Sequence, residues 1–132
     1  ARSSVTSWVL RAMSPPVQHA SAAAWNDETH VRENRRLYRE KFDAVTPLVA
    51  AHLGTARPDA GFYLWARTPI TDTEFALGLQ REYNVTVLPG SYLARASGGV
   101  NPGEHFVRIA LVASLDECLE AARRIEAFCR KL

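Results

Sequence analysis

The sequence has very little lysine and very little cysteine. Of its 16 basic residues only Lys41 and Lys131 are lysines, and the rest are arginines. Chemistry that needs an amine nucleophile therefore has two candidates, whereas arginine is suited to binding a carboxylate through paired hydrogen bonds. Cys118 and Cys129 lie about 16 Å apart along one predicted helix, too far for a disulfide within it. We expect both to be reduced, as in a cytoplasmic protein.

Long apolar runs and a strong charge imbalance are also absent from the 132 residues. No run approaches the roughly 18 apolar residues of a membrane helix. The net charge is +2, too small to require nucleic acid or an anionic membrane as a partner. With 47% hydrophobic and 23% charged residues, the composition is that of one soluble globular domain. The chain does not begin with Met, and we expect it to be a piece of a longer protein.

Hydrophobic spacing and turn residues predict a two-layer α/β fold, with a small mixed sheet and flanking helices. Helices are expected at 17–25, 27–53, 72–83 and 115–131. Strands are expected at 61–67, 85–88 and 105–113. Within the long second helix Pro47 should introduce a kink or a split, and Gly54 should close it. The last two helices each begin with the spacing of a capping box.

Arg108 is the residue that this pattern explains least. The strand around it is apolar on both alternating sets of side chains except at this arginine. A strand that is apolar on both faces is typically covered on both faces, and a guanidinium there is costly unless an anion meets it. Two interpretations stay open from the pattern alone. Arg108 either makes an internal salt bridge or binds a carboxylate in a site.

Two neighbouring segments are candidates for the edge of such a site. The strand at 85–88 stops at Pro89-Gly90, a pair that turns the chain sharply. The glycine-bearing loop at 96–103 is either a flap or a plain surface loop. It lacks the glycine patterns of nucleotide-binding loops, so a nucleotide site is not predicted.

The remaining polar clusters have structural interpretations. None of the four histidines has the spacing of a metal-ligand pair with another His or Cys, so no metal site is predicted. The long helix carries the arginine cluster Arg32, Arg35, Arg36 and Arg39, interleaved with glutamates. Pairs such as Arg36–Glu40 are typical of a solvated helix face. A partner-binding patch is the alternative, and the lack of an adjacent aromatic platform disfavours nucleic acid.

Taken together, three segments resemble one known family. LPGSYLAR at 88–95, NPGEHFVRIALVAS at 101–114 and GFYLWA at 61–66 are similar to the C-terminal domain of the fold-type-I, pyridoxal-phosphate-dependent aminotransferases. The similarity is closest to the N-succinyl-diaminopimelate aminotransferases of bacterial lysine synthesis. The stretch at 13–43 resembles the helices before that domain, so the resemblance covers residues 13–132.

The resemblance implies a binding role for Arg108, and charge matching to the implied substrate adds a second candidate. In the family, the arginine of the FVRIAL strand holds the substrate α-carboxylate through two hydrogen bonds, and Arg108 occupies that position. Arg95 is our second substrate-binding candidate, because a succinylated substrate carries further carboxylates; a plain exposed loop arginine is the alternative. The implied substrates are an amino acid and a 2-oxo acid, with pyridoxal phosphate as the electron sink.

The resemblance also implies that the catalytic part lies outside this chain. The family's Schiff-base lysine precedes this region, and neither Lys41 nor Lys131 lies in its motif. We therefore expect residues 1–12 to be an unmatched lead-in, 13–54 a helical linker segment and 55–132 the small α/β domain. The parent enzyme is expected to be a cytoplasmic homodimer that binds pyridoxal phosphate. This chain alone is expected to be inactive and to bind no cofactor.

One alternative from a different functional class remains. The chain would then be a non-catalytic α/β module that binds a partner, and Arg108 would make a structural ion pair.

Overall fold

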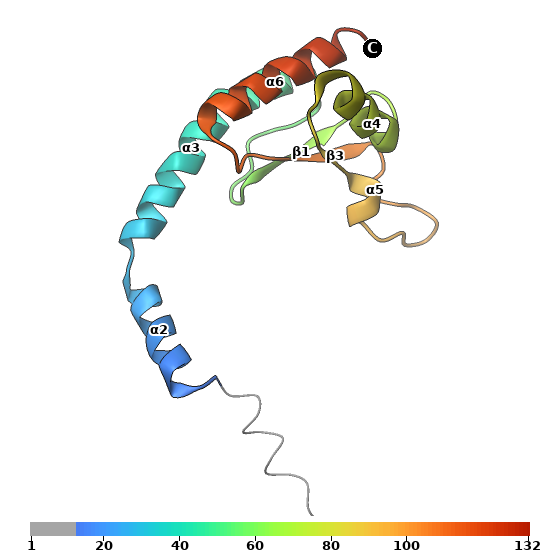
Figure 1. Cartoon of the computed structure of the whole chain (residues 1–132). Coiled ribbons are helices and arrows are strands. Elements are labelled where there is room, and N and C mark those ends of the chain that lie inside the picture. The colour runs from blue at the N-terminus through green and yellow to red at the C-terminus, as the bar shows by residue number, and fades with distance from the viewer. Residues whose placement is uncertain (1–12) are drawn as a thin grey trace, which may run out of the picture. The chain divides into compact units, whose positions relative to one another are not determined.

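The computed structural model describes residues 13–132, and the chain divides into two compact units at 1–35 and 36–132 (Figure 1). The described part of the first unit contains helix α2, Pro15–Asn26. A proline occupies the first turn of α2, where a missing N–H is tolerated. The helix predicted at 17–25 is confirmed. It buries none of its residues.

Helix α3, Thr29–Ala50, begins after Asp27, whose carboxylate accepts a hydrogen bond from the Thr29 N–H at 2.9 Å. The helix continues past Pro47, so of the predicted kink or split the split does not occur. Pro47 lies in the last turn, where the loss of one N–H interrupts little helix. Gly54 does not cap the helix either; it pairs with Arg67 in an isolated bridge.

The second unit contains one three-stranded sheet with the order β1-β3-β2. Its strands are β1, Tyr63–Arg67; β2, Leu88–Pro89; and β3, Phe106–Ala110. The predicted small sheet is confirmed, but both pairings are antiparallel, so the sheet is not mixed. Strand β2 is shorter and later than the expected 85–88, because only Leu88 and Pro89 find partners on β3. Strand β3 ends at Ala110, whose partner Tyr63 is the first residue of β1.

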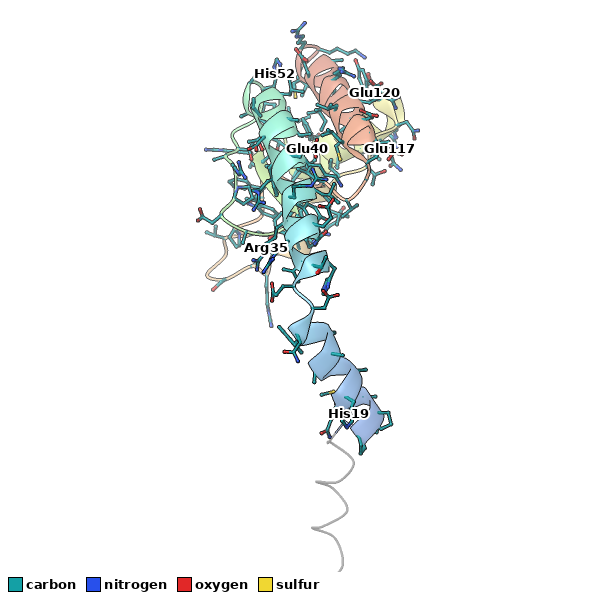
Figure 2. The ribbon with its side chains drawn as sticks, turned by 90° about the vertical axis from the view of Figure 1, so that its left-hand side faces the viewer. His19, Arg35, Glu40, His52, Glu117 and Glu120 are labelled. Carbon is teal, nitrogen blue, oxygen red and sulfur yellow. The ribbon has the colours of Figure 1, made fainter. Side chains whose placement is uncertain are left out.

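The other helices of this unit are α4, Asp72–Tyr83; the short α5, Gly90–Leu93; and α6, Leu115–Cys129. The predicted capping box at Ser114 and Glu117 is confirmed in full, and Thr71 accepts a hydrogen bond from the Glu74 N–H. Figure 1 shows α4, α6 and the C-terminal part of α3 on one side of the sheet. Figure 2, turned by 90°, shows α3 and α6 side by side; His52 lies 3.5 Å from Glu126 where they meet.

The core lies between the sheet and these helices. Leu64, Ala66, Val107 and Ile109 form the inner face of the sheet, all at most 7% exposed. They belong to one buried cluster with apolar residues of α3, α4 and α6: Phe42, Val45, Val49, Phe75, Leu79, Cys118, Ala122, Ile125 and Phe128. The predicted two-layer α/β class is confirmed. No described helix is both long and apolar enough to span a membrane.

Both cysteines of the chain are free thiols. Cys118 is buried against the Ala113 carbonyl, and Cys129 is half-buried. Burial raises the pKa of Cys129 to about 11, so this thiol stays protonated and unreactive near neutral pH.

Asp72, at the start of α4, fixes the segments that enter β3. The residue is 2% exposed. Its carboxylate accepts hydrogen bonds from the Ser91 N–H at 2.9 Å, the Ser91 hydroxyl at 2.5 Å and the His105 N–H at 3.3 Å. Burial alone would raise the pKa of Asp72, but these hydrogen bonds outweigh it and hold the pKa below its usual value.

Two glycines bring the same two segments into direct backbone contact. A Cβ atom on Gly103 would lie 2.1 Å from the carbonyl oxygen of Gly90, and one on Gly90 would lie 2.3 Å from that of Gly103. Asn101 bridges them further, donating to the Ser91 carbonyl and accepting from the Gly103 N–H, both at 3.0 Å. We call this junction of Asp72, Gly90, Ser91, Asn101, Gly103 and His105 the loop clamp.

We expect Gly103→Ala to lower the free energy of unfolding by about 2 kcal/mol, because backbone atoms must move apart to admit the methyl group. Urea unfolding followed by circular dichroism measures this. Gly98→Ala is the matched control, since Gly98 has open space around it and only a positive φ to strain, at about 1 kcal/mol. Equal losses in the two variants would contradict the close contact.

Candidate functional site

The outer face of the sheet is left uncovered by helices α3, α4 and α6. Alternation along the strands places on it Tyr63, Trp65, Arg67, Leu88, Phe106 and Arg108. Tyr63 is 37% exposed and Leu88 40% exposed. Within the described residues, helices α3, α4 and α6 cover only the inner face of β3 (Figure 1), whereas Phe106 and Arg108 on its outer face are half-buried.

Arg108 stands at the centre of this outer face. It lies in the middle of the central strand β3, with Trp65 of β1 directly opposite on one side and Leu88 of β2 on the other. The residue is half-buried. Strand pairing on both sides holds its backbone in place, so the guanidinium extends from a firmly held position of the sheet.

No carboxylate among the described residues compensates the charge of Arg108. Within residues 13–132, no Asp or Glu oxygen lies within 4.0 Å of its guanidinium. Its Nε is buried and has no hydrogen-bond acceptor in the part of the chain that the structure describes. The internal salt bridge that the sequence left open is thus absent from the described part of the chain. Since an unpaired, half-desolvated guanidinium is unfavourable, the position is suited to an anion from outside these residues.

Aromatic rings surround this cation on the outer face. Trp65 and Phe106 are stacked, with ring centroids 5.7 Å apart and an angle of 11° between the ring planes. The Cζ atom of Arg108 lies over the ring of Tyr63, 5.6 Å from its centroid. Rings exclude water and lower the local dielectric, which strengthens the attraction between a guanidinium and a bound carboxylate. The outer face therefore places the central cation, Arg108, on a largely aromatic surface.

Arg95, the second arginine predicted from the sequence, lies in the loop that follows α5. Its side chain is exposed, and no hydrogen bond or ion pair holds it within the described residues. The structure gives it no contact with Arg108. Its role therefore stays a prediction.

Neither lysine of the chain offers a free amine for a Schiff base. The Nζ of Lys41 donates to the Leu111 carbonyl at 3.1 Å and lies 5.2 Å from the ring centroid of Tyr38. The Nζ of Lys131 is paired with Glu82 at the exposed end of α6. Both amines have structural partners and neither lies on the outer sheet face, so these residues do not fit covalent attachment of pyridoxal phosphate.

A separate cleft of this unit lies away from the outer face and has acidic walls. It has a volume of about 570 Å³ and is lined by residues of α6 and by the segment after α4, including Glu117, Glu120 and Arg124. Figure 2 shows Glu117 and Glu120 along α6. Glu117 completes the capping box, where hydrogen bonds from Ser114 lower its pKa, and Glu120 is paired with Arg124 at 2.9 Å. Both carboxylates already have hydrogen-bond or ion-pair partners, so the cleft is a weaker candidate for a binding site than the surface around Arg108.

Two residues of the site region were missed by the sequence analysis. Asp72 was assigned only to a helix start, although an acid there can also reach donors from neighbouring loops. Tyr63 was placed in the predicted strand at 61–67 and was given no role. Tyr63 lies beside Arg108 because of the register between β1 and β3. The alternation of apolar and polar residues in the sequence does not predict that register.

The fold and the outer face define a small α/β domain that presents Arg108, which has no carboxylate partner within the described residues, among aromatic rings. The family model for aminotransferase class I and II matches residues 2–125. The chain therefore belongs to this family. The match begins at residue 2, so it includes most of the segment expected to be an unmatched lead-in.

The chain is also similar to individual aminotransferases, both in solved structures and in sequence. An aminotransferase from Neisseria meningitidis superposes with a TM-score of 0.84 and 49% identity, over 90% of this chain and 30% of that one. A probable N-succinyldiaminopimelate aminotransferase from Thermus thermophilus gives 0.66 and 38%, over 80% of this chain and 27% of that one. The LL-diaminopimelate aminotransferase of Maridesulfovibrio salexigens is 35% identical over 113 residues, which is 83% of this chain and 28% of that protein. The chain thus spans less than a third of the length of these relatives.

Proposed function

We propose that this chain is the small, substrate-carboxylate-binding domain of a pyridoxal-phosphate-dependent aminotransferase. The observation that carries the proposal is Arg108, a central-strand arginine with no carboxylate partner within the described residues. Its planar fork of donors matches the two oxygens of an α-carboxylate. In this proposal Arg108 binds and orients an amino acid or a 2-oxo acid.

The chemistry of amino-group transfer belongs to the remainder of the full-length enzyme. Bound pyridoxal phosphate supplies the electron sink for such a reaction. This chain contributes the carboxylate anchor and the aromatic surface around it, and by itself it is proposed to be inactive and to hold no cofactor. The full-length enzyme is proposed to be a cytoplasmic homodimer.

The competing proposal, a partner-binding module with a structural Arg108 ion pair, has less support. The ion pair that it requires is not found within residues 13–132. The arginine-bearing helix α3 shows the solvated pairing expected of a surface, with Arg36 and Glu40 at 3.2 Å. No observation in the described residues indicates what a partner would bind.

For the substrate, we propose N-succinyl-diaminopimelate and its 2-oxo counterpart, in lysine biosynthesis. The support is the relatives whose names contain diaminopimelate or N-succinyldiaminopimelate. The test is amino transfer by the full-length enzyme with glutamate as donor, comparing kcat/KM for succinylated, unmodified and aromatic acceptors. A preference for the succinylated acceptor supports the proposal. A preference for either of the others overturns the substrate assignment, and no transfer to any of them overturns the proposed function.

We expect Arg95→Ala in the full-length enzyme to raise KM for the succinylated substrate about threefold, because an exposed charge pair contributes little. The KM for glutamate should be unchanged, since glutamate lacks the succinyl carboxylate. Steady-state kinetics on both substrates check this. Arg81→Ala, which removes another exposed arginine, on α4, is the matched control. Equal increases for the two substrates would remove Arg95 from the site.

A further inference from the structure

The contact between Tyr63 and Arg108 is the one interaction found for this guanidinium within the described residues. Tyr63 pairs with Ala110, two residues beyond Arg108 on β3, so the two side chains are diagonal neighbours on the outer face. The Cζ atom of Arg108 lies 5.6 Å from the centroid of the ring. This is within the range at which an aromatic quadrupole attracts a cation.

A ring holds an arginine in a way that a carboxylate cannot. A carboxylate partner would neutralise the charge and accept hydrogen bonds from the N–H donors that a ligand needs. A π face attracts the same charge without taking up those donors as a lone-pair acceptor would. The side chain of Arg108 is therefore held in one orientation, and its terminal N–H groups remain available to a ligand. Of its three nitrogens, only Nε is both buried and without an acceptor.

The direction of the side chain matters for binding, because a free arginine loses considerable rotamer freedom when it closes on a ligand. A guanidinium already held over a ring loses less. Trp65 is directly opposite Arg108 but is stacked on Phe106, at 5.7 Å between centroids. Among the rings of the outer face, Tyr63 is thus the one whose contact orients Arg108.

We propose that Tyr63 is a positioning residue for the carboxylate site: its ring holds Arg108 in the orientation that receives the substrate carboxylate. The inference rests on the proposed function, since it assigns to Tyr63 an effect that is transmitted through Arg108. The ring is what matters in this role, and the phenolic hydroxyl is not needed.

Kinetics on the full-length enzyme test the role with three variants. Tyr63→Leu removes the ring and is expected to raise KM for amino-acid substrates about tenfold while kcat stays within about twofold. Tyr63→Phe keeps the ring and should restore the normal KM. Arg108→Lys tests the underlying function separately, because it removes the fork itself.

A second measurement does not depend on turnover. In the ¹⁵N-labelled 132-residue chain, the Nε–Hε signal of Arg108 should show restricted motion and a ring-current shift. Both should persist in Tyr63→Phe and disappear in Tyr63→Leu. Tyr92→Leu is the matched control, because Tyr92 is 76% exposed and makes no cation–π contact within the described residues.

Each outcome decides between the claims. If Arg108→Lys leaves kcat/KM intact, the proposed function fails. If Arg108→Lys is impaired but Tyr63→Leu keeps the normal KM and the normal Arg108 signal, only the positioning role fails. If Tyr63→Phe is as impaired as Tyr63→Leu, the hydroxyl is responsible and the ring-based role is wrong. A raised KM in Tyr63→Leu alone, together with a loosened Arg108 signal, supports the inference.

Discussion

Arg108→Lys is expected to reduce kcat/KM of the full-length aminotransferase for amino-acid substrates by between about one and four orders of magnitude. Lysine keeps the positive charge but loses the planar pair of donors. Each charge-assisted hydrogen bond is worth about 1.5–3 kcal/mol, and one or two of them are lost. Steady-state kinetics with glutamate and a 2-oxo acid measure the effect.

The melting temperature of the same purified variant distinguishes the two interpretations of Arg108. An arginine that binds substrate should give normal stability with poor kinetics. An arginine that serves only the fold would give a lowered melting temperature with nearly normal activity per folded molecule. Arg81→Lys, on an exposed turn of α4, is the control for the loss of a guanidinium away from the sheet. Near-normal kinetics for Arg108→Lys would end the carboxylate-binding claim.

Asp72→Ala is expected to lower the free energy of unfolding by about 4 kcal/mol. The substitution leaves the Ser91 hydroxyl and the N–H groups of Ser91 and His105 without their acceptor, and unsatisfied buried donors are costly. Chemical denaturation measures the loss. Asp116→Ala is the matched control, because Asp116 is also in a first helical turn but is exposed; it should change stability by less than about 0.5 kcal/mol. A small loss for Asp72→Ala would show that the loop clamp does not depend on its carboxylate.

The contribution of Asp72 should also depend on pH in a defined direction. Its pKa in the folded protein lies below the usual 3.8, so the unfolded chain takes up the proton first as the pH falls. The stabilisation is therefore complete above about pH 4 and is lost as the pH drops through the folded pKa. The difference in unfolding free energy between wild type and Asp72→Asn should stay constant from pH 7 to about 5 and shrink below about pH 4.

Local signals predicted those parts of the fold whose limits are set within a few residues. Thr71 with Glu74 and Ser114 with Glu117 are short-range caps, and both helices begin where these pairs place them. The short aromatic strand before α4 was predicted in the same way. In each case the favourable contacts lie within one turn of helix or one strand, so the sequence alone carries the information.

Other parts depend on partners far away in the sequence. The limits of β2 follow from which of its residues reach β3, and Leu88 opposite Arg108 is fixed by that pairing. The split considered at Pro47 does not occur, and the turn that follows carries Val49, whose burial in the core favours continuation of the helix despite the lost hydrogen bond. The openness of the outer sheet face could not be predicted, since composition shows that side chains are apolar but not which of them the helices cover.

The loop clamp has a consequence for how this domain can change. Beyond it, Ser97 and Val100 close a small turn through Gly98 and Gly99, in a segment that is exposed throughout. The loop clamp holds both ends of the loop at 91–102. Changes in the length or sequence of the loop tip should therefore not disturb the sheet. Loop-closure cost grows only slowly with added residues, so an affinity peptide or a fluorescent label inserted between the two tip glycines should leave the carboxylate anchor where it is. The tip of this loop thus offers an attachment point for probes that is separate from Arg108.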